Sequence, residues 1–308
     1  MTRLDRGFVP DEQFDRLREL RATRPSAIAE ALATRTRRPV LNDAGRLFIV
    51  AADHPARGAL GIGDDPMAMA DRYDLLDRLA LALSRPGVDG VLGTPDIIDD
   101  LALLGALDGK VVVGSMNRGG IRGAAFEMDD RFTGYDVDGI VRDGLDFAKT
   151  LLRINLADPA SVATIEANAR AVDAAAAARV PIMLEPFMSR WQDGRVVNDL
   201  TPEAVITSIS IASGLGSSSA YTWMKLPVVD DMERVMASTT LPTLLLGGER
   251  NADPDANYAA WERTLALPGV RGLVVGRALL YPHDHDVAAA VDTAAALVHD
   301  SELTKEAS

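Results

Sequence analysis

Two lysines stand inside apolar, strand-like segments of this chain. Lys149 lies in FAKTLL and Lys225 in YTWMKLPVV, and they are two of only four lysines in a sequence that has twenty-eight arginines. An ammonium group that is taken out of water loses its hydration, and its pKa falls. An amine with a lowered pKa can attack a carbonyl carbon near neutral pH and form an imine. The two lysines are therefore the first candidates for nucleophilic chemistry.

Two carboxylates, Asp53 and Glu185, end other apolar runs of the sequence. Side chains alternate across a strand, so each of the four charged residues shares one face of its strand with apolar neighbours. If the four faces point to a common interior, one lysine can act as the nucleophile while the other lowers its pKa by repulsion, and the carboxylates can move protons. The alternative interpretation is a structural network of buried ion pairs.

The amino-acid composition excludes several kinds of metal and redox site. The 308 residues contain no cysteine, which excludes disulfides, thiolate metal sites and iron–sulfur clusters. His283 and His285 stand close together in YPHDHD but lack a third neighbouring ligand, so a solvated turn is the favoured interpretation. We expect neither a metal ion nor another cofactor.

The charge of the chain argues against several partners. Its formal net charge is −13 and no basic stripe for a phosphate backbone is visible, so we expect no nucleic acid. Residues 1–17 lack the apolar core of a signal peptide, and no run of about 18 apolar residues could span a membrane. We expect a cytoplasmic protein that contacts no membrane, acts on a small molecule and forms a homo-oligomer.

Apolar runs alternate with helix-periodic segments from about Leu47 to the C-terminus. The eight runs cover residues 47–53, 88–94, 110–116, 146–152, 180–185, 220–226, 241–247 and 270–276. Such runs, each followed by a helix like those expected at 66–84, 158–179 and 201–212, indicate parallel strands that are buried on both faces. Eight of these units predict an α/β protein with a single (β/α)8 TIM barrel.

The remaining segments flank this barrel. Residues 1–46 are predicted to form an N-terminal helical extension, with two helices between about 11 and 36. Residues 47–300 make up the predicted barrel, and 301–308 are predicted to be a flexible tail. No linker or change of composition divides the barrel into two domains.

Polar residues gather where the predicted strands end, and barrel chemistry takes place at these ends and in the loops that follow. His54 follows the first run and Ser115 ends the third, and both are candidate contacts for a substrate. The loops after the third and fifth runs, about 117–135 and 186–200, are long for such connections and are candidate lids.

The sequence resembles the class I aldolases of the branch that holds tagatose-bisphosphate, sulfofructose-phosphate and archaeal-type fructose-bisphosphate aldolases. The resemblance spans about residues 47–282 and is carried, in order, by IVAADHPARGAL, GLDFAKTLL, PIMLEPF, YTWMKLPV, TLLLGGE and GLVVGRALLYP. It implies that Lys225 forms the Schiff base. It also implies that Lys149, Glu185 and Asp53 match the other charged residues of the family's site.

The resemblance bears on the substrate in two ways. Relatives commonly bind phosphate with glycine amides and an arginine after the seventh and eighth strands, which implies a phosphate site at Gly247, Gly248, Gly276 and Arg277. Their first-strand motif often reads Asp-Gln-Arg or Asp-His-Gly, whereas this chain has Asp-His-Pro at 53–55. Recognition of the far end of the substrate therefore does not carry over from the family.

The residues and the resemblance together predict a metal-independent class I aldolase. This lyase of carbohydrate metabolism would cleave a phosphorylated keto sugar or keto-sugar acid through a lysine imine. The expected roles are imine formation for Lys225, acid and base chemistry for Glu185, positioning or protonation for Asp53, and tuning of the nucleophile and substrate contact for Lys149. Two alternatives stay open: an imine-forming transferase, similar to a transaldolase or a thiolase, and a sugar-phosphate-binding barrel without catalysis.

Overall fold

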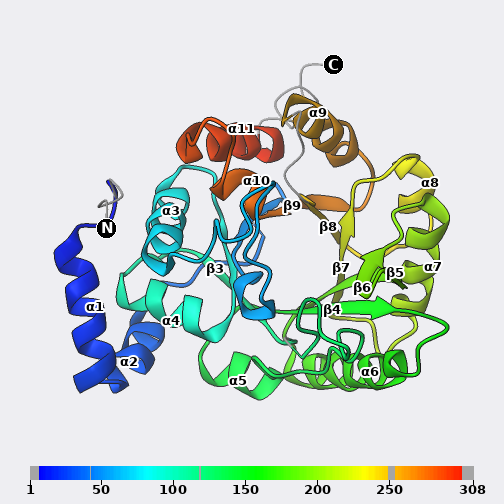
Figure 1. Cartoon of the computed structure of the whole chain (residues 1–308), viewed down its shortest axis with the longest axis horizontal. Coiled ribbons are helices and arrows are strands. Elements are labelled where there is room, and N and C mark those ends of the chain that lie inside the picture. Colours follow the sequence, from blue (N-terminus) through cyan, green and yellow to red (C-terminus); the bar gives the residue numbers. More distant parts are fainter. Residues whose placement is uncertain (1–6, 42, 118, 249–253, 300–308) are drawn as a thin grey trace.

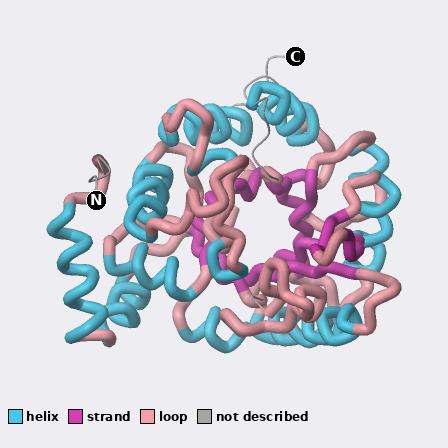
Figure 2. The backbone as a smooth tube through the Cα atoms, in the orientation of Figure 1, coloured by secondary structure: helices cyan, strands magenta, loops and turns pink. Residues whose placement is uncertain are grey.

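Eight parallel strands close into a barrel in the part of the chain that the structure describes, and helices surround them (Figures 1 and 2). The structure is a computed structural model that describes residues 7–41, 43–117, 119–248 and 254–299. Neighbouring strands pair in the order β4-β3-β2-β1-β9-β8-β7-β5, and β5 pairs with β4 to close the ring. The predicted tail at 301–308 lies outside the described residues.

Each barrel strand overlaps one of the eight apolar runs, which confirms the predicted (β/α)8 barrel. The strands are β1 (Leu47–Ala51), β2 (Gly90–Gly93), β3 (Val111–Ser115), β4 (Phe147–Ile154), β5 (Ile182–Gln192), β7 (Thr222–Pro227), β8 (Thr243–Leu246) and β9 (Val270–Val275). A further strand, β6 (Arg195–Asn198), pairs antiparallel with the end of β5. The segment expected to be a long loop at 186–200 is therefore mostly a hairpin.

Helices follow the strands as the apolar periodicity predicts, and two more precede β1. Within the described ranges they are α1 (Asp11–Thr23), α2 (Ser26–Thr34), α3 (Arg72–Ser84), α4 (Pro95–Leu103), α5 (Val137–Arg142), α6 (Ala160–Ala178), α7 (Pro202–Ser213), α8 (Met232–Met236), α9 (Pro254–Leu265), α10 (Arg277–Leu280) and α11 (Val287–His299), with a 3-10 turn η1 (Pro55–Arg57). None of them combines the length and apolar character that crossing a bilayer requires.

The start of α3 corrects one boundary. A helix was expected from residue 66, but α3 begins at Arg72, because the carboxylate of Asp71 accepts hydrogen bonds from the backbone N–H groups of Tyr73 and Asp74. A side chain that binds these otherwise unpaired donors fixes the first turn of a helix. Residues 55–70 instead form η1 and a loop above the end of β1.

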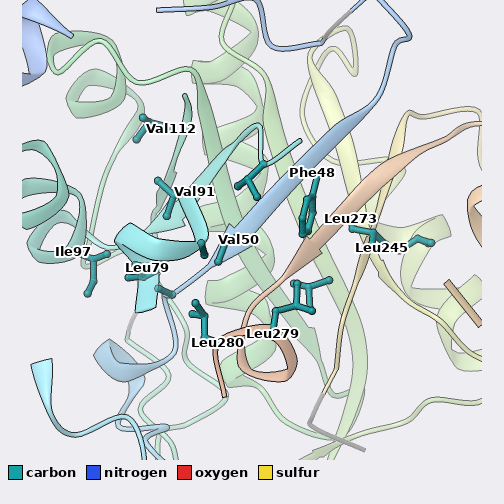
Figure 3. Packing of buried hydrophobic residues seen from close by; sticks show 14 of the residues in the cluster. Phe48, Val50, Leu79, Val91, Ile97, Val112, Leu245, Leu273, Leu279 and Leu280 are labelled. Carbon is teal, nitrogen blue, oxygen red and sulfur yellow. The ribbon is translucent and has the colours of Figure 1, made fainter. Parts of the chain in front are cut away.

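The two faces of the barrel strands enter two separate apolar clusters. Phe48 and Val50 point outward and pack with helix residues such as Leu79 and Leu279 (Figure 3). The alternate residues Leu47 and Ile49 fill the interior with side chains from the other strands. The interior also holds Phe147, against whose ring Trp223 packs edge-on at 5.4 Å between centroids.

A buried ion pair ties the segment after α2 to the end of the barrel at which the strands begin. Arg35 Nη2 lies 2.8 Å from Asp146 Oδ2, and both side chains are 3% exposed. The same guanidinium donates to the carbonyl oxygens of Lys110 and Gly144. This contact fastens the N-terminal segment at the end of the barrel opposite to the strand ends that carry chemistry in this fold.

Phe48→Ala tests the outer core. Phe48 is fully buried, so its truncation removes apolar contacts and leaves a cavity that lowers the free energy of unfolding by about 3–5 kcal/mol. Urea unfolding followed by circular dichroism measures the change. Leu156→Ala is the matched control, because Leu156 is 82% exposed and its loss changes stability by less than about 0.5 kcal/mol. Equal effects of the two substitutions would contradict the assignment of Phe48 to the core.

Candidate active site

Four charged side chains from β1, β4, β5 and β7 meet in the barrel. Asp53 follows the end of β1, whereas Lys149, Glu185 and Lys225 stand within their strands. Lys225 Nζ lies 2.8 Å from Glu185 Oε1, and Lys149 Nζ lies 2.5 Å from Glu185 Oε2. Lys149 Nζ also donates to Asp53 Oδ2 at 3.1 Å. The four residues are buried, and Lys225 is only 4% exposed. They form a continuous chain in which amines and carboxylates alternate.

Strand register sets these groups above an apolar floor. On the inward faces, Phe147 precedes Lys149 by two residues and Met183 precedes Glu185 by two residues. Trp223, two residues before Lys225, packs against the same interior cluster. The charged ends therefore stand one layer above side chains that offer no hydrogen bonds to a charged group apart from the indole N–H of the tryptophan.

The surroundings change the ionisation of two of these groups. Burial lowers the pKa of Lys225; the charge of Glu185 opposes this effect and that of Lys149 adds to it, so the pKa stays below 10.5. Burial would raise the pKa of Glu185, but the two lysines outweigh burial and lower the value to about 2. At neutral pH the site therefore holds an ionised carboxylate beside an amine that gives up its proton more readily than a free lysine.

Ser115 lies beside Asp53 and is fully buried. Its Oγ donates to Asp53 Oδ2 at 2.9 Å, the same oxygen that binds Lys149. The register of β3 and β4 sets Ser115 opposite Lys149. The hydroxyl of Ser115 thus orients the carboxylate of Asp53, and its contact with a substrate stays a prediction.

His54 and Arg277 occupy the β1 and β9 side of the site. His54 Nδ1 lies 3.7 Å from Asp53 Oδ1. Burial and then the positive charge of Arg277 lower the pKa of His54 to about 3, so its ring is neutral at physiological pH. The charge of Arg277 thus reaches the mouth of the site from the start of α10.

The glycines expected to bind phosphate have structural reasons of their own. A Cβ on Gly276 would overlap the carbonyl oxygen of Ala51, and one on Gly247 would overlap the side chain of Val275. Gly248 has a φ of 65°, a backbone conformation that favours glycine. Glycine at these positions is explained without an anion. Residues 249–253, which follow Gly248, lie outside the described residues.

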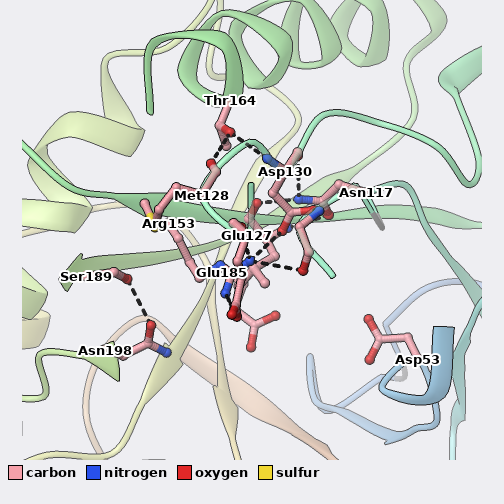
Figure 4. A network of polar contacts seen from close by, with 12 residues as sticks. Asp53, Asn117, Glu127, Met128, Asp130, Arg153, Thr164, Glu185, Ser189 and Asn198 are labelled. Carbon is pink, nitrogen blue, oxygen red and sulfur yellow. Dashed lines mark hydrogen bonds and ion pairs between the residues drawn. The ribbon is translucent and has the colours of Figure 1, made fainter. Parts of the chain in front are cut away.

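A second buried ionic cluster, missed from the sequence, stands above the first (Figure 4). Arg153, four residues after Lys149 on β4, pairs with Glu127 and Asp130 from the loop after β3. The signal was available in the spacing, because residues 149, 151 and 153 share one face of a strand. The expected lid at 117–135 is thus fastened to the barrel, apart from residue 118, which lies outside the described residues.

The described ranges contain no group of three histidine or acidic side chains that could hold a metal ion.

The chain is similar to a protein family and to several solved structures. The family model described as Cgl0159-like matches residues 45–295. The crystal structure of Cgl0159 from Corynebacterium glutamicum is 67% identical, covers 95% of this chain and 98% of that chain, and superposes with a TM-score of 0.93. No curated protein matches the chain.

Two archaeal fructose 1,6-bisphosphate aldolase structures share the fold at lower identity. One is 21% identical over 89% of this chain and 99% of that chain, with a TM-score of 0.62. The other has its catalytic lysine covalently bound to the carbinolamine intermediate of the substrate. It is 23% identical over 88% of this chain and 99% of that chain, with a TM-score of 0.63.

Glu185→Gln tests the electrostatics of the site through stability. Removing the carboxylate leaves two ammonium groups facing each other, which destabilises the fold by about 3–5 kcal/mol at pH 7. The folded-state pKa of Glu185, about 2, lies below the ordinary value of 4.5, so its contribution is complete above pH 4.5 and is lost as the pH falls toward 2. The difference in unfolding free energy between wild type and variant therefore shrinks over that window.

Urea unfolding at pH 7, 5 and 3 measures this difference. Glu166→Gln is the control, because Glu166 is exposed and pairs only with exposed Arg170 among the ion pairs of the described residues. Its effect should stay near zero at each pH. A Glu185→Gln difference that does not depend on pH would contradict the ionised state of this carboxylate.

Proposed function

The chain belongs to the Cgl0159-like family, and we propose that it is a metal-independent class I aldolase that cleaves a phosphorylated keto sugar or keto-sugar acid through an imine on Lys225. The observation that carries the proposal is the buried Lys225 amine, with the Glu185 carboxylate at 2.8 Å and the second amine of Lys149 on the other carboxylate oxygen. The shared fold with aldolases that form a covalent lysine intermediate supports it.

Imine formation uses the low pKa of Lys225. The neutral amine attacks the ketone carbon of the substrate and gives a carbinolamine. Glu185 is ionised in the resting site, so it acts first as a base that takes a proton from the attacking nitrogen. It returns this proton to the carbinolamine oxygen, which becomes a hydroxyl group. A second proton, the one that Lys225 released when its ammonium group became the neutral amine, converts this hydroxyl to water, which leaves. The product is an iminium ion in the place of the former ammonium group.

Cleavage uses the iminium ion as an electron sink. A carboxylate removes the proton from the hydroxyl group β to the iminium carbon, the adjacent C–C bond breaks, and its electron pair forms an enamine as the aldehyde leaves. Protonation of the enamine and hydrolysis of the imine release the second product and restore Lys225. Glu185 is the leading group for these proton transfers because it contacts Lys225 directly, and Asp53 is held farther away through Lys149.

Arg277 is the proposed partner for the phosphate. Its charge acts on His54, which follows the end of β1. Asp53 and Glu185 compensate the charges of Lys149 and Lys225, so the charge of Arg277 is the one proposed to attract an anionic substrate to this acidic protein. The backbone amides near Gly247 and Gly276 are proposed to complete this pocket.

Borohydride reduction tests the imine. With a cleavable keto-sugar phosphate present, borohydride should add one substrate fragment per chain, and peptide mapping should place it on Lys225. Lys225→Ala should abolish the adduct, whereas Lys110→Ala, a lysine at the opposite end of the barrel, should leave it intact. An adduct on Lys149 would reverse the two roles.

Two outcomes of this experiment favour the other functions. No adduct with any carbonyl substrate would contradict the aldolase and indicate a binding protein. An adduct that turns over only when a second carbonyl compound accepts the fragment would indicate a transferase. Release of both fragments without an acceptor is the result that the proposed aldolase requires.

Arg277→Ala tests the phosphate pocket. A lost charged hydrogen bond weakens binding by about 10- to 100-fold, so Kd for a phosphorylated substrate should rise by this factor while Kd for the dephosphorylated analogue changes little. Isothermal titration measures both. Arg131→Ala, which removes an exposed arginine paired with Asp129, should change neither value. Equal weakening of both ligands by Arg277→Ala would mean that the arginine has a structural role.

A further inference from the structure

Strand β4, which carries Lys149, extends beyond the end of the neighbouring strand β3. The β3–β4 ladder ends where Ser115 pairs with Lys149, but β4 continues to Ile154. Beyond the ladder, the inward residues Leu151 and Arg153 are still 4% and 2% exposed. Something other than β3 must cover this side of the barrel mouth. The loop between β3 and α5 supplies the cover.

The loop is folded around the guanidinium group of Arg153 (Figure 4). Arg153 Nη1 donates to Glu127 Oε1 at 2.7 Å, and Nη2 donates to the carbonyl oxygens of Glu127 at 2.7 Å and Gly120 at 3.3 Å. Nη2 also lies 3.5 Å from Asp130 Oδ2. A Cβ on Gly120 would overlap this nitrogen, so glycine permits the close approach.

The two carboxylates also hold the loop to itself and to a helix. Glu127 Oε2 accepts from the N–H of Gly123 at 2.7 Å, and Asp130 Oδ1 accepts from the N–H of Gly120 at 3.0 Å. The N–H of Asp130 donates to the hydroxyl of Thr164 on α6 at 2.9 Å. The loop groups that bind Arg153 are therefore also held by hydrogen bonds within the loop.

The start of the loop holds β4 between its two charged residues. The side chain of Asn117 accepts from the N–H of Leu151 at 2.8 Å and donates to the carbonyl oxygen of the same residue. An amide side chain therefore continues the β3–β4 ladder for one more residue after the backbone has turned away. Leu151 stands midway between Lys149 and Arg153 on the inward face.

We propose that Arg153 is a positioning residue that folds residues 119–135 into a fixed wall and keeps water out of the β4 side of the active site. The inference rests on the proposed function, because it assigns the wall a role in the chemistry of Lys225. A buried ion pair adds little to stability compared with well-packed apolar side chains. The ion pairs of Arg153 with Glu127 and Asp130 are therefore better explained by the position that they give to residues 119–135 than by a gain in stability.

We expect the wall to act on Lys225 by limiting the access of water to this end of the barrel, since burial is the largest cause of the low pKa of this amine. The groups that face the amine are Glu185 on β5, Lys149 on β4 and Asp53 after β1, with the neutral ring of His54 next to Asp53. These four groups are kept when Arg153 is replaced, but Glu127 and Asp130 then lose a buried cation, which also favours the ammonium form. Gly120→Ala, which removes no charge, separates this effect from the entry of water. Water that enters from the β4 side would stabilise the ammonium form and raise the pKa.

Arg153→Met, compared with Arg35→Met, separates this role from stability. Arg35 is also buried and pairs with a carboxylate and two backbone carbonyls, but it lies at the opposite end of the barrel. Trypsin should cut Arg153→Met after Arg122 and Arg131 in the released loop and leave wild type and Arg35→Met uncut there. Arg153→Lys should restore part of the protection.

The pH dependence of borohydride trapping is the second measurement. The midpoint for trapping on Lys225 should move to higher pH by about one unit in Arg153→Met, a fraction of the ~3–5 units that complete burial can produce. Trapping at pH 7 should fall by about 10-fold. Arg35→Met should keep the wild-type midpoint even where it lowers the unfolding temperature as much.

The inference is overturned if Arg153→Met stays protected from trypsin or shares the midpoint of Arg35→Met. If Arg153→Met does not fold, Gly120→Ala provides the second test, because its methyl group would overlap the Arg153 guanidinium and the carbonyl oxygen of Glu127 that binds it, without removing a charge. A wild-type protein that forms no adduct contradicts the proposed function instead. Trypsin cleavage requires no substrate. It therefore tests whether Arg153 anchors the loop even if the wild-type protein forms no adduct.

Discussion

The compensation of charge inside the barrel is the constraint on which the site depends. Two ammonium groups and two carboxylates are buried together, and each has a partner of opposite sign within 3.1 Å. Removal of any one leaves an uncompensated buried charge, which costs more than the pair contributes. Apolar side chains of the barrel interior pack beside these four groups, and the strands hold their backbones in place. The distances between the four groups are therefore set before a substrate binds.

Much of this arrangement was readable from local pattern. The period of two along each strand is a property of a few consecutive residues, so it identified the barrel strands and placed Lys149 and Lys225 on inward faces. The contacts that depend on distant segments were not readable in this way. The hydrogen bond from Ser115 to Asp53 is one of these, because it depends on where the end of β1 lies beside β3.

The segments after the strands also divide into features that the local sequence indicates and contacts that depend on distant residues. The start of α3 was misplaced because the apolar period runs on through residues 66–71, although the cap at Asp71 had a readable signal. The hairpin of β5 and β6 and the ionic cluster of Arg153, Glu127 and Asp130 have weaker local signals. A guanidinium group shared by several parts of a loop becomes visible only when the loop is folded. Arg35 and Arg153 both form buried ion pairs with carboxylates, but they lie at opposite ends of the barrel. Arg35 fastens the N-terminal segment, and Arg153 is proposed to hold the loop beside the active site.

Direct titration of Lys225 tests the central claim that this buried network produces a reactive amine. The chain has four lysines, so NMR of protein labelled with 15N-lysine gives few side-chain signals, and Lys225→Arg identifies one of them. We expect Lys225 to titrate below 10.5, and its pKa to rise in Lys149→Met, because the repelling charge is gone. Titration of Lys225 at its ordinary value, unchanged by loss of Lys149, would contradict the account.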